Sequence, residues 1–358
     1  MNIIGSAYKV CIFGSSHGPF IGGSVQGCPH GEKISTTAIQ IELDRRAPGK
    51  GPVSTPRSER DRIEIVSGLH NGRATGAPIV GLVKNRDCDS SAYDAFRRVP
   101  RPGHADYPAL VKYGGSNDHR GGGQFSGRMT AGLVFAGAVA RQVLERRKVR
   151  VLAQTIQVGK VRLEKQVPFS AAEKLTRTNA VCCADRAVAE RMKDEIVKAH
   201  EEKDSVGGIV RCTVLGVPVG VGEPFFGSIE SSLSAMMFSI PGVKGVDFGA
   251  GFASGALRGS ENNDPFIIRN KKIVTKSNNA GGILGGLSTG MPIEFKVAFK
   301  PTSSIAKPQM SVDIEAKKPI ELVVSGRHDP CIVPRAVPVV ENSAAAVILD
   351  LMLQGGFI

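Results

Sequence analysis

The feature that most limits the fold is a pair of short apolar runs joined by a glycine-containing turn. In "RIEIVSGLHNGRATGAPIVGLVKN", residues 62–85, apolar and polar residues alternate before and after the segment "NGRATG". This pattern predicts a β-hairpin. Hairpins build antiparallel sheets, whereas a doubly wound parallel sheet needs a helical crossover between its strands. No long linker divides the chain, so we expect one α+β domain over residues 1–358.

Other segments complete the expected set of elements. Strands are predicted at residues 7–13, 149–161, 207–222, 293–301 and 320–326. Helices are predicted at residues 35–49, 130–147, 185–203, 228–242 and 342–354, and the second of these should be apolar on one side. Residues 101–130 are rich in turns, and "RHDPCIVPRAVPVVE" precedes the last helix as a separate segment. Each half carries a glycine-rich block beside a helix, which is compatible with an internal duplication.

The charge of the chain points to an anionic partner. Lys and Arg number 46 against 33 Asp and Glu, so the net charge is +13. A nucleic-acid surface would interleave basic residues with aromatics, but aromatics make up only 5% and "RGGG" occurs once. We therefore expect small anionic molecules, and no nucleic acid, as partners. A gel shift at moderate salt tests the RNA-binding alternative.

Cysteine usage and hydropathy bear on the compartment. The seven cysteines contain no CxxC pair, and the adjacent Cys182 and Cys183 cannot form a relaxed disulfide with each other. The first residues lack the apolar core and cleavage site of a signal peptide, and the longest apolar run, "AGLVFAGAVA", ends at Arg141. These features predict a cytoplasmic protein with reduced thiols and no membrane association. No spacing typical of a metal site occurs.

The first candidate site residue is His17, in "FGSSHGPF". Its small neighbours offer nothing that would bury the ring in an apolar core. They also allow a ligand to approach the imidazole closely. A structural histidine is the alternative interpretation.

Two later loops carry basic residues beside tight turns. "VPRPGHADY" places Arg101, His104 and Asp106 in a segment stiffened by two prolines, which suits an anionic ligand. "DHRGGGQFSGRMT" sets three glycines between Arg120 and Arg128, so its backbone N–H groups can approach an anion or a flat ring. A surface turn with solvated charges is the alternative for the first of these loops.

Four further segments fit the same kind of ligand. "NAGGILGGLSTGMP" is neither a Walker A loop nor a GxGxxG motif, and it precedes "KPTSSI", where a lysine and three hydroxyls form a candidate phosphate cradle. "GRHDPCIVPRAVP" holds an Asp between arginines, and "LDRRAPG" ends a helix with two arginines. Together the segments suit an enzyme that binds polyanionic ligands and transfers protons.

In this combination the motifs resemble those of chorismate synthase. "GSSHG", "LDRRAPG", "RPGHADY", "DHRGGGQFSGR", "SIPGVKGVDFG", "NAGGILGGLSTGMP", "KPTSSI" and "RHDPCIVPRAVPVVE" occur in the family's order over nearly the whole chain. The resemblance implies a sandwich of two antiparallel sheets enclosing helices, and a homotetramer. It also implies 1,4-elimination of phosphate from 5-enolpyruvylshikimate 3-phosphate. The product is chorismate, in the shikimate pathway to aromatic amino acids, and reduced FMN is needed without net redox change.

The resemblance also implies roles for single residues. Three are catalytic: His17 protonates the departing phosphate, His104 faces the reduced flavin, and Asp329 passes a proton away. Four line the anionic substrate pocket: Arg45, Arg46, Arg128 and Arg327. The flavin-contact positions are Gln124, Phe125, Ser126, Pro241, Gly242, Gly285, Lys300, Pro301, Thr302, Ser303, Ser304 and Arg327. Arg46 also matches a position associated with NADP, so NADPH is a candidate reductant of the flavin.

The chain departs from the family pattern at Ser15, Ala47, Pro52, Gln124 and Met129. These departures bear on cofactor contacts and on the handling of NADPH. A flavin- or nicotinamide-dependent oxidoreductase is one alternative, and stoichiometric NADPH consumption would favour it. A catalytically inactive relative is another, although His17, His104 and Asp329 argue against it.

Overall fold

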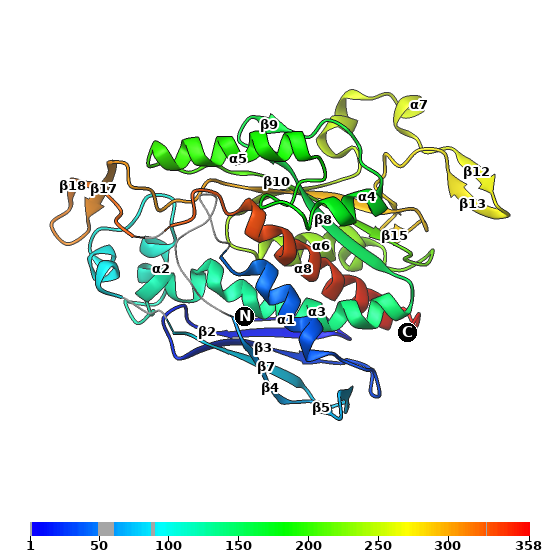
Figure 1. Ribbon diagram of the computed structural model, residues 1–358, viewed down its shortest axis with the longest axis horizontal. Helices are drawn as coiled ribbons and strands as arrows, with labels where there is room; N and C mark the ends of the chain where they lie inside the picture. The colour runs from blue at the N-terminus through cyan, green and yellow to red at the C-terminus, as the bar shows by residue number, and fades with distance from the viewer. Residues whose placement is uncertain (1, 49–60, 87–89, 327) are drawn as a thin grey trace.

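The computed structural model describes residues 2–48, 61–86, 90–326 and 328–358. Within them, two five-stranded antiparallel sheets lie on either side of a layer of helices (Figure 1). The first sheet has the order β1-β2-β3-β7-β4, with bounds Ile3–Ile4, Lys9–Gly14, Phe20–Gln26, Ile79–Lys84 and Ile63–Ser67. The second has the order β11-β16-β10-β8-β9, with bounds Val243–Phe248, Ile293–Phe299, Gly208–Leu215, Arg150–Val158 and Val161–Arg162. The α+β prediction is confirmed.

The helices between the sheets form the core. They are α1 (Thr36–Arg46), α3 (Thr130–Arg146), α6 (Ile229–Phe238) and α8 (Val333–Gln354). α3 packs on β2 and β3 of the first sheet, α8 packs on β8 and β10 of the second, and the two helices pack against each other. α4 (Phe169–Leu175) and α5 (Arg186–Glu201) contact β8 from outside this layer (Figure 1).

Local signals place most of these elements correctly. The predicted hairpin is confirmed, because β4 pairs with β7 in the register Ile63↔Val83, and β5 (Leu69–His70) with β6 (Arg73–Ala74) forms its tip. Three helices, α1, α5 and α6, begin after a capping side chain. The oxygens of Ser35, Asp185 and Ser228 accept backbone N–H groups of the first turn of these helices. The predicted strand at residues 320–326 lies earlier, as β18 (Lys318–Leu322), paired with β17 (Gln309–Asp313).

Two helix predictions need correction. α3 is buried on all sides over Thr130–Arg141, not on one, because a sheet covers one face and α8 the other. α8 begins at Val333 and includes the segment that we expected to precede it. Pro334 lies in the first turn, where proline is tolerated. Pro338 lies inside the helix and cannot donate to the carbonyl oxygen of Pro334, which instead lies 3.9 Å from the Cys182 thiol.

α8 is also long and apolar enough to cross a bilayer, with a mean hydropathy of 1.6 over its most apolar stretch. Of that stretch, 94% is buried inside the protein, as expected for the core helix of a three-layer fold. Its apolar character is therefore explained by its position between α3 and the second sheet.

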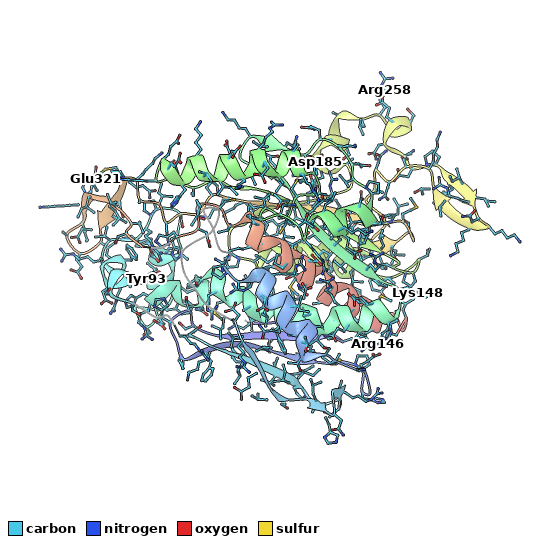
Figure 2. All side chains as sticks on the ribbon, viewed as in Figure 1. Tyr93, Arg146, Lys148, Asp185, Arg258 and Glu321 are labelled. Atoms are coloured by element: carbon cyan, nitrogen blue, oxygen red, sulfur yellow. The ribbon has the colours of Figure 1, made fainter. Side chains whose placement is uncertain are left out.

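Smaller elements extend from the two ends of the molecule. At one end lie η1 (Ser91–Arg97), α2 (Asp106–Lys112) and the β17–β18 hairpin (Figure 1). At the other lie η5 (Gly251–Ala256), α7 (Gly259–Asn262), the β12–β13 hairpin (Phe266–Arg269, Lys272–Thr275) and the β14–β15 hairpin (Ile283–Leu284, Leu287–Ser288). Tyr93 of η1 and Arg258, next to α7, mark the two ends in Figure 2. The short helix α2 falls in a segment that we expected to be rich in turns.

Candidate active site

His17 lies in the turn between β2 and β3, and the residue is 7% exposed. Nδ1 is 2.8 Å from the hydroxyl of Ser90, and the ring meets Tyr93 edge-on with centroids 5.2 Å apart. The expectation that nothing would bury this ring is therefore wrong. The residues that cover it lie more than 70 positions away along the chain, so its own flanks could not reveal them. A buried imidazole held by a hydroxyl and by an aromatic ring has a fixed orientation.

The three glycines of η2 (Arg120–Phe125) separate His17 from His104. Gly121, Gly122 and Gly123 all have positive φ, at 61°, 81° and 54°, a conformation that other residues rarely adopt. A Cβ on Gly121 would lie 2.3 Å from His17 Cδ2, and one on Gly122 would lie 3.4 Å from His104 Nε2. The same short backbone segment therefore packs against both predicted catalytic histidines.

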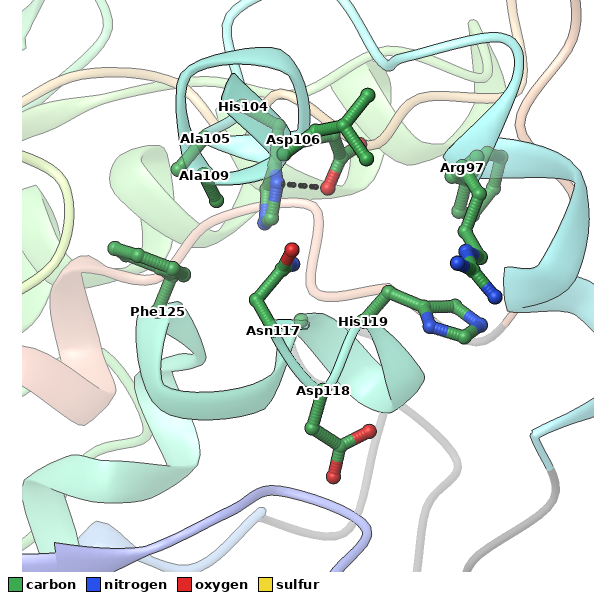
Figure 3. Close-up of a pocket in the computed structure, with 12 residues that line it drawn as sticks. Arg97, His104, Ala105, Asp106, Ala109, Asn117, Asp118, His119 and Phe125 are labelled. Carbon is green, nitrogen blue, oxygen red and sulfur yellow. Dashed lines mark ion pairs between the residues drawn. The ribbon is translucent and has the colours of Figure 1, made fainter. Parts of the chain in front are cut away.

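His104 is oriented by a partly buried carboxylate at the start of α2. Its Nδ1 lies 2.6 Å from Asp106 Oδ1 (Figure 3). Arg101 donates to Asp106 Oδ2 through Nε at 2.8 Å and through its backbone N–H at 3.1 Å. Burial alone would raise the pKa of Asp106, but hydrogen bonds from Arg101 and His104 hold it well below its usual range. The carboxylate therefore stays ionised and fixes the imidazole ring.

A small cavity adjoins His104 (Figure 3). It has a volume of about 20 Å³, and its lining includes Asn117, Asp118, His119, Gly122 and Phe125. This volume holds one water molecule and not a flavin. The Phe125 ring, a predicted flavin contact, lies on one side of the cavity and also packs on Tyr113 with centroids 6.4 Å apart.

The predicted phosphate cradle packs on the loop that carries His104. Lys300 Nζ donates to the carbonyl oxygen of Gly103, and Ser304 Oγ accepts from Arg101 Nη1 at 3.1 Å. The backbone N–H of Lys300 donates to the carbonyl oxygen of Gly242 at 2.9 Å, which adds the predicted Pro241–Gly242 contact to the group. Burial, and then the nearby Lys244, lower the pKa of Lys300. The positive surroundings of Lys300 favour an anion beside it.

Asp329 forms an ion pair with Arg335 of α8. Arg335 also donates through Nε to the carbonyl oxygen of Arg46, at 3.1 Å. The adjacent His328 lies close enough to the His104 loop for Arg101 to influence it: burial first, and then Arg101, lower the pKa of His328. The segment that holds Asp329 thus adjoins both the His104 loop and the end of α1.

Arg46 and Arg128 share one carboxylate, that of Asp61. Asp61 is fully buried and forms ion pairs with both guanidinium groups. Burial alone would raise the pKa of Asp61, but Arg46 and Arg128 hold it below its usual range. Arg128 also donates through Nε to Asn85 Oδ1 at 3.0 Å. Two of the predicted substrate-binding arginines therefore lie side by side.

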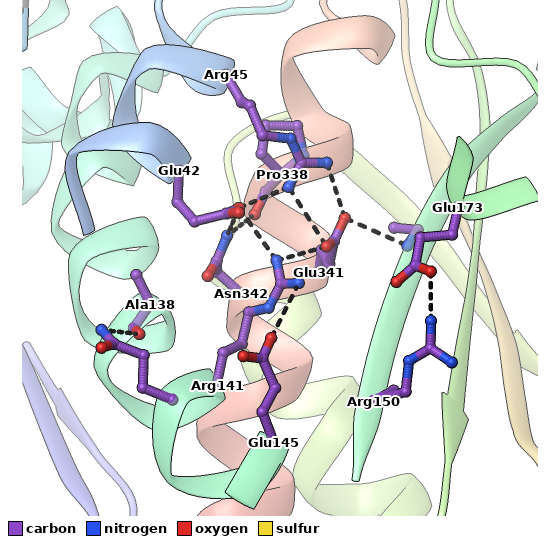
Figure 4. A network of polar contacts seen from close by, with 12 residues as sticks. Glu42, Arg45, Ala138, Arg141, Glu145, Arg150, Glu173, Pro338, Glu341 and Asn342 are labelled. Carbon is purple, nitrogen blue, oxygen red and sulfur yellow. Dashed lines mark hydrogen bonds and ion pairs between the residues drawn. The ribbon is translucent and has the colours of Figure 1, made fainter. Parts of the chain in front are cut away.

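Arg45 lies in a different buried network, between α1, α3 and α8 (Figure 4). It contacts Glu42 at 2.6 Å and Glu341 at 2.9 Å, and Arg141 contacts the same two carboxylates. Glu341 is fully buried, which alone would raise its pKa, but Arg141 and Arg45 hold that pKa below its usual range. This network ties the helix layer together, and a substrate contact for Arg45 stays a prediction.

The remaining predicted positions divide into three groups. Ser126 caps η3 (Gly127–Met129) by accepting the backbone N–H of Arg128 at 3.3 Å, and Gln124 precedes Phe125 in η2. Gly285 lies in the turn of the β14–β15 hairpin, at the end of the molecule opposite α2 (Figure 1), so one copy does not bring it to His104. Arg327 and Pro52 lie outside the described residues.

Sequence reasoning missed four residues that hold the site in place: Asp61, Asn85, Ser90 and Tyr93. None belongs to a glycine- or proline-rich motif. Asp61 is a single carboxylate before a strand, and Ser90 is one hydroxyl in a polar segment. Their contacts with His17 and the arginines join parts of the chain that are far apart in sequence. One weak signal existed for Asp61, because "ERDR" places it between two arginines.

The fold and the site together define an α+β protein in which two oriented histidines lie close to paired arginines and a lysine. The profile of the chorismate synthase family matches residues 8–353. A chorismate synthase from Korarchaeum cryptofilum is 48% identical over 353 residues, which cover 99% of this chain and 98% of that protein. One from Methanococcoides burtonii is 45% identical over 357 residues, which cover 100% and 97%.

A solved structure agrees with these two relatives. A crystal structure of chorismate synthase superimposes with a TM-score of 0.77 at 25% identity, covering 98% of this chain and 93% of that one. This chain belongs to the chorismate synthase family, which is a family of lyases in aromatic amino acid biosynthesis.

Proposed function

We propose that this protein converts 5-enolpyruvylshikimate 3-phosphate to chorismate and inorganic phosphate, with reduced FMN required but not consumed. The observation that carries the proposal is the packing of His17 and His104 against adjacent glycines, Gly121 and Gly122, of one triple-glycine loop. Arg46 and Arg128 lie together on the carboxylate of Asp61, and Lys300 supports the His104 loop. The substrate carries a phosphate and two carboxylates, which such cations would bind.

The proposed reaction breaks a C–O bond to phosphate and a C–H bond, and forms a C=C bond. His17 donates a proton to the departing phosphate, and Asp329 accepts the ring proton and passes it away. The Ser90 hydroxyl, 2.8 Å from Nδ1, orients the His17 ring for this transfer. Arg128 and Arg46 stabilise the negative charge that develops on the leaving group.

The residues present also fit a bound flavin phosphate. Among the described residues, the buried hydroxyls of Ser16 and Thr302 have no hydrogen-bond partner, and a buried polar group without a partner is costly. The Thr302 hydroxyl lies in the predicted phosphate cradle, and that of Ser16 adjoins His17. Reduced FMN, when bound, supplies an electron to the substrate and takes it back. We propose that Lys300, Thr302, Ser303 and Ser304 hold its phosphate.

Anaerobic incubation with substrate and reduced FMN tests this function. We expect chorismate and phosphate to appear together, in equal amounts, with no net oxidation of the flavin. Full activity without any flavin would contradict the proposal. Consumption of one NADPH per turnover would instead indicate an oxidoreductase.

Lys300→Ala is expected to weaken FMN binding by about 10- to 100-fold, since a charge-assisted hydrogen bond contributes ~1.5–3 kcal/mol. Substrate affinity should change less. Flavin fluorescence titration, beside a substrate-induced thermal shift, measures the two affinities. Lys244→Ala is the matched control, because it removes an exposed positive charge close to Lys300 without altering the cradle. Equal losses for both ligands would contradict a dedicated role in flavin binding.

The assembly and compartment also belong to this proposal. The end of the molecule that carries the β12–β13 hairpin exposes large apolar side chains, including Phe226 at 97%, Phe252 at 91% and Ile268 at 80%. Surfaces of this kind are typically covered by another chain. We propose a cytoplasmic homotetramer that buries them, and light scattering that gave a monomer mass would contradict it.

Reduction of the flavin by NADPH stays a prediction. Arg46, the position associated with NADP, is 2% exposed and is paired with Asp61.

A further inference from the structure

We infer that Asp61 is the positioning residue of this site: it holds Arg46 and Arg128 in place and links the turn of His17 to Asp329. This inference rests on the proposed function. It concerns a carboxylate whose ion pairs, among the described residues, are with Arg46 and Arg128. Its action is through the two arginines.

The first step is the contact of Asp61 with the arginines. Its side chain is fully buried, and each of its oxygens takes a different partner: Oδ2 pairs with Arg46 Nη2 and Oδ1 with Arg128 Nη1. One rigid carboxylate thus sets the spacing between two guanidinium groups that come from α1 and η3. Two arginines alone would repel each other at this distance, since both carry a fixed positive charge.

The second step leads from Arg128 to His17. Arg128 Nε donates to Asn85 Oδ1 at 3.0 Å. Asn85 Nδ2 donates to the carbonyl oxygens of Ser15 at 3.0 Å and Gly18 at 2.7 Å, which flank His17 in its turn. Asn85 is 8% exposed, so these bonds are shielded from water. A shift of Arg128 would therefore move the backbone that carries the proposed acid.

The third step leads from Arg46 to Asp329. The carbonyl oxygen of Arg46 accepts from Arg335 Nε at 3.1 Å, and Arg335 Nη1 pairs with Asp329. The polar chain thus runs from the His17 turn through Asn85, Arg128 and Asp61, and then through Arg46 and Arg335 to Asp329. It connects the proposed proton donor with the proposed proton acceptor, and Asp61 lies between its two arms.

Charge alone gives a competing explanation with the opposite outcome. Asp61 and its two arginines carry a net charge of +1. If Asp61 merely reduced the positive charge, its removal would leave +2 and bind a polyanionic substrate more tightly. If Asp61 positions the arginines, its removal weakens binding and slows the reaction, because the guanidinium groups and the His17 turn lose their alignment.

Asp61→Asn tests the inference, with kcat and KM measured anaerobically with reduced FMN and normalised to folded protein. We expect kcat/KM to fall by roughly 10- to 100-fold, the loss seen when a residue that orients metal ligands is removed, with a higher KM and a lower kcat. The thermal shift produced by substrate alone, without flavin, should also shrink. A lower KM would overturn the inference in favour of charge reduction. Unchanged kcat and KM with a lower melting temperature would overturn it in favour of a structural role.

Asn85→Ala gives a second test that leaves the charges intact. It removes the bonds between Arg128 and the His17 turn, so it should lower kcat more than it raises KM. An Asn85→Ala variant with normal kcat would contradict the arm to His17, even if Asp61→Asn failed to fold. Combined with Asp61→Asn, it should lower kcat/KM by less than the product of the two single effects, because both act through Arg128.

Asp350→Asn is the control. Asp350 is another buried carboxylate, 9% exposed, and it accepts the backbone N–H groups of Ser6, Ala7 and Tyr8. Its loss should lower the melting temperature and leave kcat and KM unchanged. If the wild-type protein formed no chorismate, the proposed function would fail; if it did and Asp61→Asn matched it, only the positioning role would fail.

Discussion

His17→Ala is expected to lower kcat by about 10²–10⁴-fold, the usual contribution of one general acid. The effect should fall on kcat and leave KM nearly unchanged, because the proton is needed only as the C–O bond to phosphate breaks. The structure supports a defined donor, since the ring is held by Ser90 at 2.8 Å and by Tyr93. Steady-state kinetics under anaerobic conditions, beside a melting curve, measure both quantities.

Two comparison variants make this result specific. His30→Ala removes a histidine that lies near Gly76, away from the triple-glycine loop, and should leave kcat unchanged. His104→Ala should instead alter the absorption spectrum of bound reduced FMN, if that histidine faces the flavin. A normal kcat with a lower melting temperature in His17→Ala would show that the ring has only a packing role under Gly121.

Asp329→Asn is expected to lower kcat by a similar factor, roughly 10²–10⁴-fold, if the carboxylate accepts a proton in the transition state. Flavin binding and the fold should persist, because the amide keeps one oxygen for Arg335. The same kinetic assay, with flavin binding measured by fluorescence, separates the two effects.

The ion pair with Arg335 gives a structural alternative for Asp329. If pairing were its only role, the Asn variant would melt at a lower temperature and keep its rate per folded molecule. Glu173→Gln is the control, since Glu173 pairs with Arg150 on the surface of the molecule, and it should change neither kcat nor flavin affinity. Loss of rate in both variants would point to a general effect on the fold.

Much of the fold could be predicted because its signals are local. The alternation in β16 matches its burial, with Ile293, Phe295, Val297 and Phe299 inside, and a capping side chain marks the start of α1, α5 and α6. The start of α8 could not be predicted in this way. Its two prolines predict the end of a helix. Only the packing of α8 against α3 and β8 outweighs the loss of a helix hydrogen bond at Pro338.

The candidate site divides in the same manner. Motifs rich in glycine and proline disclosed His17, His104 and the Lys300 segment, because such motifs require particular backbone conformations. Asp61, Asn85 and Ser90 hold these residues through contacts that only the folded chain creates. The burial of His17 and the placement of Arg45 among Glu42 and Glu341 belong to the same class. Side-chain partners across the middle layer leave no trace in local spacing.

The position of α8 has a consequence for the order of events during synthesis. It covers the inner side of α3, which ends at Arg146, and the inner face of β8 and β10, yet its own residues are 333–354. A ribosome adding ~5–20 residues per second makes α8 roughly 10–40 s after α3. Once β8 and β10 have also been made, the nascent chain has apolar surfaces on both sides of the space that α8 will fill. Chaperones that shield growing chains therefore have a long time in which to bind this protein before α8 packs into its core.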